Sequence, residues 1–267
     1  MSVRNAEDDV DTRLRARQLS LGYGDRMVVE GLDLEVPHGA LTAIVGPNAC
    51  GKSTLLRSFV RLQPARAGAV ELDETRIDAW KGKEVAKQLG FLPQTALSPE
   101  GIRVEALVRR GRYAHQSMLS SWNPSDESAV EKAMTAAGVV ELADRPLAEL
   151  SGGQRQRVWI AMVLAQETPY LLLDEPTTFL DIAHQYDLLR LLRGLVDEGR
   201  TVVVVLHDLN QACRFADHVV AMRDGSVVAA GTAAEVVTAE VVEAVFGMES
   251  VIVTDPVAGT PMVVPAH

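Results

Sequence analysis

The stretch that decides the fold is residues 46–53, "GPNACGKS", which match the pattern GxxxxGK[ST]. The apolar run "LTAIV" (residues 41–45) precedes it and the helical pattern "STLLRSFVRL" follows it, as this motif requires. The backbone N–H groups of such a loop and the N-terminus of the following helix form an anion site. Lys52 then reaches the β- and γ-phosphates of a nucleotide, and the Ser53 hydroxyl ligates Mg²⁺. The stretch therefore predicts a loop that binds nucleoside triphosphate.

Three continuous apolar runs predict buried strands. They are "LTAIV", "YLLL" (residues 170–173) and "TVVVVL" (residues 201–206). Short runs that are apolar throughout are typical of parallel strands covered by helices on both faces. Helical patterns, such as that of residues 181–199, lie between them. The alternation predicts an α/β fold with a doubly wound core, whose ligands bind at the carboxyl ends of the strands.

Other segments surround this core. Apolar residues alternate from Leu14 to Val36 around "GYGD", which predicts a small antiparallel sheet. Between residues 98 and 150 no strong β pattern occurs, and "VEALVRRGRYA" and "DESAVEKAMTAAGVVELA" predict an inserted helical subdomain. The stretch "HVVAMRDGSVVAAG" (residues 218–231) predicts a β-hairpin. The tail after Asp255 gives no clear prediction.

Two adjacent carboxylates end the second apolar run. We expect Asp174, on a strand beside the one that leads into the phosphate loop, to hold Mg²⁺ through its water shell. Glu175 points elsewhere and is placed to act as general base for an attacking water. An ordinary solvated strand end is the alternative interpretation, but Pro176 stops the strand there. His207, in "VVVLHD", is a candidate to contact the γ-phosphate or orient the water, although a lone histidine at a strand end is usually structural.

The composition indicates which partners and which cellular compartment suit the protein. The 267 residues are 47% hydrophobic and carry a formal net charge of −10, which argues against a nucleic-acid partner. The two cysteines, Cys50 and Cys213, form no CxxC pair and indicate a reducing compartment, and we expect Cys50 to be a buried, inert thiol. The first residues do not resemble a secretion signal. No apolar run is long enough for a membrane span, so work at a membrane would need a partner.

Together these motifs resemble the ATP-binding subunit of ABC transporters. "GPNACGKST" resembles the Walker A loop of that family and "YLLLDEP" its Walker B strand. Four shorter matches are "LSGGQ" (150–154, the signature), "LHD" (206–208, the switch histidine), "LPQ" (92–94, the Q-loop) and "FLD" (179–181, the D-loop). The resemblance implies a P-loop NTPase fold: a RecA-like parallel sheet core, an N-terminal antiparallel β subdomain and an inserted helical subdomain.

The resemblance also implies boundaries. A single ABC ATPase domain would span residues 14–267, after a disordered tail of residues 1–13. Within it, residues 14–97 and 161–267 would form the nucleotide-binding core, and residues 98–160 the helical signature subdomain.

In the family, two copies pack head to tail, and each ATP lies between the phosphate loop of one and the signature loop of the other. This accounts for a second glycine-rich loop that opens a helix. The implied cofactors are ATP and Mg²⁺; the implied catalytic residues are Glu175, His207 and Gln94, and the implied metal ligands are Ser53, Gln94 and Asp174. Tyr23 would stack on adenine, or else be a plain strand aromatic. The implied nucleotide contacts are Tyr23, Gly46, Pro47, Asn48, Ala49, Cys50, Gly51, Lys52, Ser53, Thr54, Ser151, Gly152, Gly153, Gln154 and Asp181.

Within the ABC family the chain is most similar to the ATPases of ferric-siderophore and related iron-chelate importers, through "RGRYAHQ", "DEPTTFLDIAHQ" and "VLHDLNQACRFADH". This likeness implies an integral membrane permease, an extracytoplasmic substrate-binding protein and a peripheral location on the cytoplasmic face of the membrane. Cobalamin and haem importers are alternatives. A soluble ABC ATPase that acts on ribosomes or DNA is another, which the single set of motifs and the acidic balance disfavour.

Two positions depart from the common family pattern. Ala49 stands where many ABC loops have glycine, and Phe179 stands where many have alanine. Neither change removes a charged or metal-binding group, so we expect hydrolysis to be retained. The alanine does require that its position does not demand a positive φ.

Overall fold

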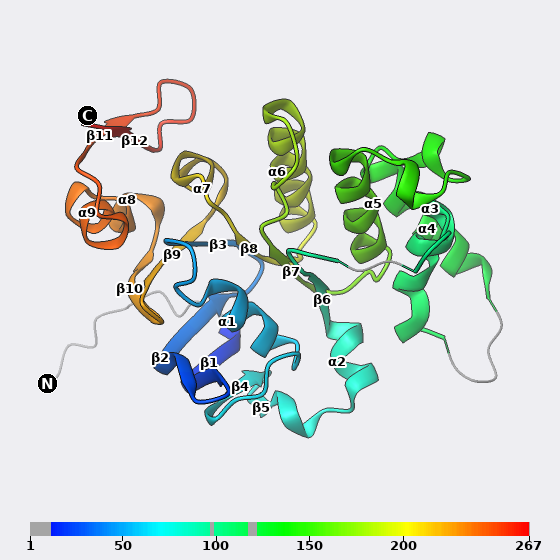
Figure 1. Cartoon of the computed structure of the whole chain (residues 1–267), viewed down its shortest axis with the longest axis horizontal. Coiled ribbons are helices and arrows are strands. Elements are labelled where there is room, and N and C mark those ends of the chain that lie inside the picture. Colours follow the sequence, from blue (N-terminus) through cyan, green and yellow to red (C-terminus); the bar gives the residue numbers. More distant parts are fainter. Residues whose placement is uncertain (1–11, 97–98, 117–121, 267) are drawn as a thin grey trace, which may run out of the picture.

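The computed structural model describes residues 12–96, 99–116 and 122–266, in which a central six-stranded sheet is flanked by helices (Figure 1). Every residue of its strands β3, β8 and β7 is buried, as continuous apolar runs predict. The sheet is parallel except for β10, which pairs antiparallel with β9 and confirms the predicted hairpin. In sheet order the strands are β10 (Ser226–Gly231), β9 (His218–Arg223), β3 (Leu41–Val45), β8 (Thr201–Val205), β7 (Tyr170–Asp174) and β6 (Leu89–Leu92).

One expectation about strand order is wrong. The strand that carries Asp174 does not lie beside the strand that leads into the phosphate loop, because β8 separates β7 from β3. Strand order depends on the crossover connections, which apolar patterning does not reveal. Helix α1 (Lys52–Phe59) nevertheless starts close enough to β7 for Ser53 to reach Asp174.

The N-terminal segment forms a four-stranded sheet against one face of this core. The antiparallel pairing of β1 and β2 confirms the prediction for residues 14–36. Strand β1 begins at Thr12, two residues before the expected start of the domain. The rest of the expected tail, residues 1–11, lies outside the described residues. The strands, in sheet order, are β2 (Arg26–Pro37), β1 (Thr12–Tyr23), β4 (Ala67–Leu72) and β5 (Thr75–Arg76).

The two faces of the central sheet bury different partners. Along β7, Tyr170 and Leu172 join a core made with α1 and the N-terminal sheet. Leu171 and Leu173 point to the opposite face and join the core made with the helices. This alternation is the period of two that a strand imposes on its side chains. On the first face, η1 (Ile77–Ala79) and α2 (Gly82–Gln88) connect β5 to β6.

The segment between β6 and β7 is helical, as predicted. Over residues 99–116 and 122–150 the structure contains no strand, only an isolated bridge between Arg103 and Pro146. The last helix runs to Leu164 and so crosses the boundary expected at residue 160. Residues 97–98 and 117–121 lie outside the described part. The elements are α3 (Val104–Arg109), η2 (Arg110–Ala114), α4 (Pro124–Ala136), η3 (Val140–Leu142), η4 (Leu147–Glu149) and α5 (Gly152–Leu164).

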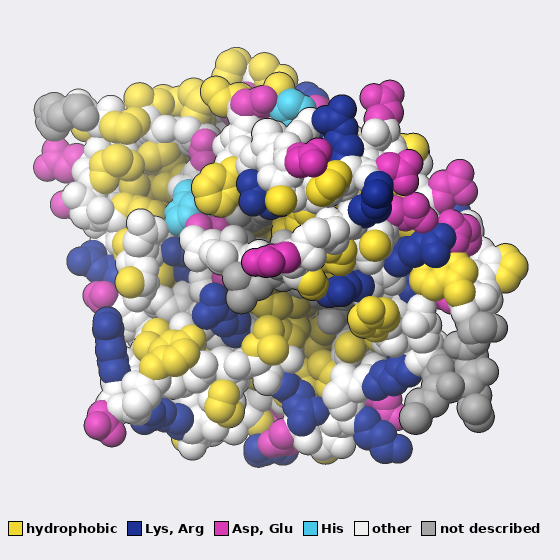
Figure 2. Space-filling model, turned by 45° about the vertical axis from the view of Figure 1, so that its right-hand side comes forward, with side chains coloured by type: hydrophobic (Ala, Val, Ile, Leu, Met, Phe, Trp, Pro, Cys, Tyr) yellow, Lys and Arg dark blue, Asp and Glu magenta, His cyan; other side chains and the backbone are white. Residues whose placement is uncertain are grey.

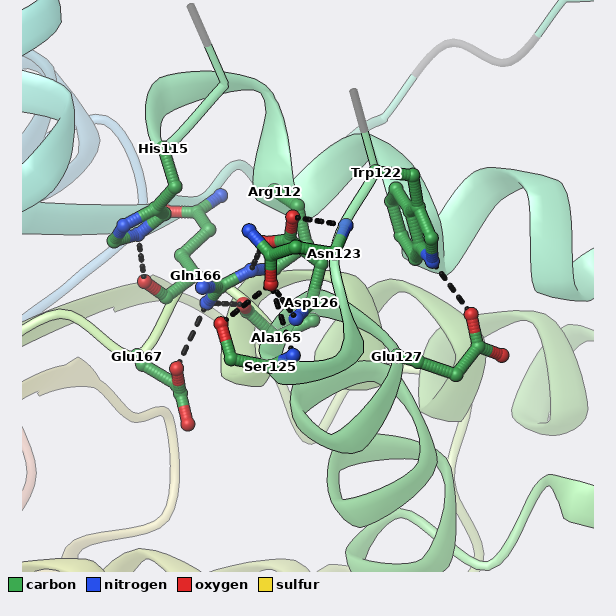
Figure 3. A network of polar contacts seen from close by, with 10 residues as sticks. All are labelled: Arg112, His115, Trp122, Asn123, Ser125, Asp126, Glu127, Ala165, Gln166 and Glu167. Atoms are coloured by element: carbon green, nitrogen blue, oxygen red, sulfur yellow. Dashed lines mark hydrogen bonds and ion pairs between the residues drawn. The ribbon is translucent and has the colours of Figure 1, made fainter. Parts of the chain in front are cut away.

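A buried arginine ties this helical insert together (Figure 3). Arg112 donates from Nε to Oδ1 of Asp126 at 2.9 Å, and both side chains are almost fully buried. Its Nη1 donates to the carbonyl oxygen of Ala165 at 2.8 Å and to Oε2 of Glu167 at 2.9 Å. A buried charge is tolerated when it is paired and hydrogen-bonded in this way. One guanidinium thus joins η2, α4 and the segment just after α5.

The C-terminal part completes the core and then adds a small hairpin. None of the helices in the described ranges combines the length and hydropathy that crossing a bilayer requires. On the face drawn in Figure 2, Lys and Arg side chains are interspersed with Asp and Glu. This hairpin was not predicted from the sequence; its strands are β11 (Ser250–Thr254) and β12 (Pro261–Pro265). The helices of this part are α6 (Ile182–Asp197), α7 (Leu209–Phe215), α8 (Ala233–Val236) and α9 (Ala239–Phe246).

Candidate functional site

The predicted phosphate loop connects the end of β3 to the start of α1. Gly46 and Gly51 have φ values of 153° and 107°, which residues other than glycine rarely adopt. A Cβ atom on Gly46 would also lie 2.2 Å from the carbonyl oxygen of Met222. Lys52 is only 4% exposed, and its Nζ donates to the carbonyl oxygens of Gly46 and Pro47, both at 2.8 Å. The loop therefore curls around its own lysine, with the ammonium group at its centre.

The expectation about the backbone conformation of Ala49 is wrong. Its φ is 63°, in the left-handed region where L-residues are disfavoured. A positive φ was not expected at this position, because the residue is an alanine. The loop conformation is set by its neighbours and by the start of α1, so the alanine adopts the conformation that glycine takes more easily. The Ala49 backbone is consequently strained, but no functional group is lost.

We expect Ala49→Gly to stabilise the nucleotide-free protein. Glycine removes the left-handed strain but loses more chain entropy on folding, so the net gain in the free energy of unfolding should be about 0.5 kcal/mol. Urea denaturation of both proteins measures it. Ala65→Gly is the matched control, because Ala65 is an exposed loop alanine without a positive φ, and it should be destabilised. A loss of stability in Ala49→Gly equal to that of the control would contradict the strain at Ala49.

Asp174 presents one free carboxylate oxygen near the phosphate loop. Its Oδ1 accepts a hydrogen bond from Ser53 Oγ at 2.8 Å, while the buried Oδ2 has no hydrogen-bond partner among the described residues. Burial raises the pKa of the Asp174 carboxyl above its ordinary value, against the lowering effect of the Ser53 hydrogen bond. A hydroxyl beside an unsatisfied carboxylate oxygen is the donor set that Mg²⁺ prefers, and the fit to that cation is good.

Glu175 is held by two donors on separate elements. Gln94 Nε2 donates to Glu175 Oε2 at 2.6 Å, and His207 Nε2 lies 2.8 Å from the same oxygen. Glu175 has a φ of 54°, so the chain turns sharply after β7 and its side chain departs from the strand alternation. The structure therefore brings all three expected catalytic residues together, on the segments that follow β6, β7 and β8.

A cavity of about 570 Å³ joins the phosphate loop to these residues. Tyr23 lies at it and is 47% exposed, so its ring is free to stack on a base. Two arginines that sequence reasoning missed, Arg26 and Arg57, also line it. Arg57 lies four positions after Ser53 on α1, a helical spacing that would have placed it on the same face. The lining residues are Tyr23, Arg26, Val28, Asn48, Ala49, Gly51, Lys52, Ser53, Thr54, Arg57, Gln94, Glu175 and His207.

Cys50 lies within the loop but turns away from this cavity. Its side chain is buried in the core between the loop and the N-terminal sheet. Burial raises the pKa of the Cys50 thiol, and burial likewise raises the pKa of Cys213 to about 11. Both thiols are free and buried, as expected for Cys50.

The signature residues do not reach this cavity within one chain. Ser151 caps α5: its Oγ accepts from the backbone N–H of Gln154 at 3.2 Å, and the Gln154 side chain accepts from the Ser151 N–H at 3.1 Å. Gly152 and Gly153 form the first turn of α5, close to Phe179. Asp181 caps α6 by accepting from the His184 N–H at 3.0 Å. These five expected contacts therefore stand apart from the phosphate loop of their own chain.

The fold and this site define a P-loop ATPase, in which a phosphate loop faces a strand-end carboxylate pair. Comparison with known proteins refines that class: the family described as ABC transporter matches residues 29–178. The ferric enterobactin transport ATP-binding protein FepC of Escherichia coli (strain K12) is 56% identical over 254 residues, covering 95% of this chain and 94% of that protein. The hemin import ATP-binding protein HmuV of Pseudomonas aeruginosa is 41% identical, covering 94% and 99%. The chain belongs to the ABC transporter family.

Solved structures agree with this assignment. A chain of a metal-chelate type ABC transporter in an inward-facing conformation superposes with a TM-score of 0.81 at 28% identity, covering 96% of this chain and 98% of that one. A dimeric bacterial ABC transporter cassette superposes with a TM-score of 0.75 at 27% identity, covering 82% and 98%. The predicted fold class is thereby confirmed.

Proposed function

We propose that this chain is the ATP-hydrolysing subunit of an importer that takes up a ferric siderophore through a separate membrane permease. The observation that carries the proposal is the assembled site, in which Glu175 contacts both Gln94 and His207 beside the phosphate loop. The cargo follows from relatives that are 56%, 51% and 47% identical, named for ferric enterobactin, siderophore and iron(3+)-hydroxamate transport.

Each group at the site has a role in hydrolysis under this proposal. The loop N–H groups and Lys52 bind the phosphates of ATP. Ser53, Asp174 and Gln94 would hold Mg²⁺, which neutralises charge on the β- and γ-phosphates when it is bound. The Glu175 carboxylate accepts a proton from water as the water oxygen bonds to the γ-phosphorus and the bond to ADP breaks. His207 orients that water or contacts the γ-phosphate.

The remaining expected contacts fit a head-to-tail dimer of this chain. Ser151, Gly152, Gly153 and Gln154 lie at the N-terminus of α5, where the helix dipole and free N–H groups attract anions. In such a dimer they would close over the γ-phosphate held by the other copy, with Asp181 near the same interface. ATP would then join the two copies, and its hydrolysis would release them. The similarity to a dimeric cassette supports this arrangement.

Import of such a cargo requires further protein partners. The proposal includes an integral membrane permease and an extracytoplasmic substrate-binding protein, with this chain peripheral on the cytoplasmic face of the membrane. Hemin import is the second candidate, favoured by two relatives named for it at 41% and 39% identity. Siderophore import ranks first because the relatives named for it are more similar.

Uptake of radiolabelled cargo tests the proposal. Cells whose only copy carries Glu175→Gln are starved of iron and offered ferric siderophores, haem and cobalamin in parallel. Cells with Glu198→Gln, which changes an exposed carboxylate at the end of α6, are the matched control. Loss of uptake for one ferric chelate in the first strain alone supports the function and names the cargo. Loss of haem or cobalamin uptake alone would move the cargo, and unaffected uptake of all three would overturn the importer role.

A further inference from the structure

The hairpin β11–β12 packs against the helix that follows the switch histidine (Figure 1). Strand β12 pairs with β11 on one side, with Val263 opposite Ile252. Its other edge faces α7. An open strand edge leaves N–H and C=O groups that need partners. Among the described residues, a side chain from the first turn of α7 binds that edge.

That side chain is Asn210. Its Oδ1 accepts a hydrogen bond from the Val263 N–H at 2.7 Å, and its Nδ2 donates to the Val263 carbonyl oxygen at 3.2 Å. An amide side chain can satisfy the backbone donor and acceptor of one residue at once. The pair therefore fixes both the position and the rotation of the Asn210 side chain relative to the hairpin.

The first turn of α7 links the fixed Asn210 side chain to His207. Asp208 caps the helix: its Oδ1 accepts from the N–H groups of Asn210 at 2.8 Å and of Gln211 at 3.1 Å. On the opposite side, the buried Gln211 donates to Gln185 Oε1 of α6 at 2.7 Å. His207 directly precedes the capped turn, so any movement of the turn displaces the imidazole from its 2.8 Å contact with Glu175.

The first turn of α7 also lies beside a hollow on the hairpin side. A cavity of about 310 Å³ separates Leu209 from Phe246 and Met248, and His207 and Val263 also line it. His207 lines the nucleotide cavity as well. Val263 and Leu209 pack on the same apolar core, and the polar pair between Asn210 and Val263 adds a directional contact that resists movement of the turn relative to the hairpin.

We propose that Asn210 is a positioning residue for hydrolysis, through which the C-terminal hairpin holds His207 against Glu175. The inference rests on the role of His207 in the proposed function. It assigns to the hairpin, which lies outside the matched family segment, a part in the ATPase cycle. Asn210 contacts neither the nucleotide cavity nor Glu175, so it acts only through the histidine.

The test is a double-mutant cycle on full-length protein, with ATP hydrolysis measured as kcat and KM. Asn210→Ala should lower kcat about tenfold and leave KM for ATP within about twofold, because the pocket that binds the nucleotide is untouched. In a His207→Ala background, followed by single-turnover assay, Asn210→Ala should have almost no further effect. Arg214→Gln is the matched control, since Arg214 ties the far end of α7 to the hairpin at Asp255 and should leave kcat unchanged.

The outcomes distinguish a failure of this inference from a failure of the role proposed for His207. An equal fall in kcat in both backgrounds would mean that Asn210 acts by general destabilisation, and an unchanged kcat in folded protein would mean that it does not act; either overturns the inference alone. An unchanged kcat in His207→Ala would overturn the role of His207 and the inference with it. Should Asn210→Ala fail to fold, Asn210→Asp, which keeps the acceptor for the Val263 N–H and loses the donor to its carbonyl oxygen, should lower kcat by less than about tenfold without changing KM, and an unchanged kcat would overturn the inference.

Discussion

Glu175→Gln is expected to lower the rate of ATP hydrolysis by about a hundredfold to ten-thousandfold, the usual worth of a general base. The amide still offers an oxygen to Gln94 and His207, so the geometry of the site should persist. What is lost is the group that takes the proton from water. Binding of Mg-ATP should be retained, because Lys52, Ser53 and Asp174 are unchanged. Phosphate release measures the first effect and calorimetry the second.

Glu198→Gln serves again as the control for loss of one carboxylate, and it should hydrolyse ATP at the rate of the unaltered protein. A Glu175→Gln variant with full activity would show that another group takes the proton. The same variant tests the dimer, since trapped ATP should hold two copies together. A monomer by light scattering in saturating Mg-ATP would contradict the head-to-tail arrangement for the isolated subunit.

Lys52→Ala is expected to weaken ATP binding about 10- to 100-fold, which corresponds to the loss of hydrogen bonds to a charged partner. In the structure the ammonium group bonds to two carbonyl oxygens of its own loop, from which it can turn to the phosphates without a large movement. The alanine variant loses the charge and also loosens the loop. Titration calorimetry with Mg-ATP gives the affinity.

The matched control for this change is Lys132→Ala, which removes an exposed lysine from α4. It should bind ATP as the unaltered protein does. Because Lys52 is buried, thermal denaturation without nucleotide must first show that its variant folds. Unchanged ATP affinity in a folded Lys52→Ala protein would contradict the role assigned to this residue.

The sequence predicted the core because its strands have unmistakable patterns. The runs at residues 41–45, 170–173 and 201–206 contain no charged residue, and each becomes a fully buried strand of the central sheet. Strand order was not accessible in the same way. No local pattern states that β8 lies between β3 and β7, since that order follows from how the connecting helices cross the sheet.

The C-terminal hairpin was not predicted from the sequence, for a different reason. The segments "SVIVT" and "PMVVP" are short and only partly buried, and the six residues that separate them, 255–260, look like an ordinary loop. Their valines and the intervening Pro256 and Gly259 are nonetheless a hairpin signal. The backbone conformation of the phosphate loop was also not predicted, because the positive φ of Ala49 depends on the surrounding loop.

The arginine that ties the helical insert has a mechanical meaning. Because the Arg112 guanidinium binds both α4 and the backbone at Ala165, we expect a load applied to the insert to pass to the chain after α5. The load arrives at residues 165–167, just before β7, the strand that carries Asp174 and leads into Glu175. The Arg112 guanidinium thus couples the helical insert to the chain just ahead of the carboxylate strand.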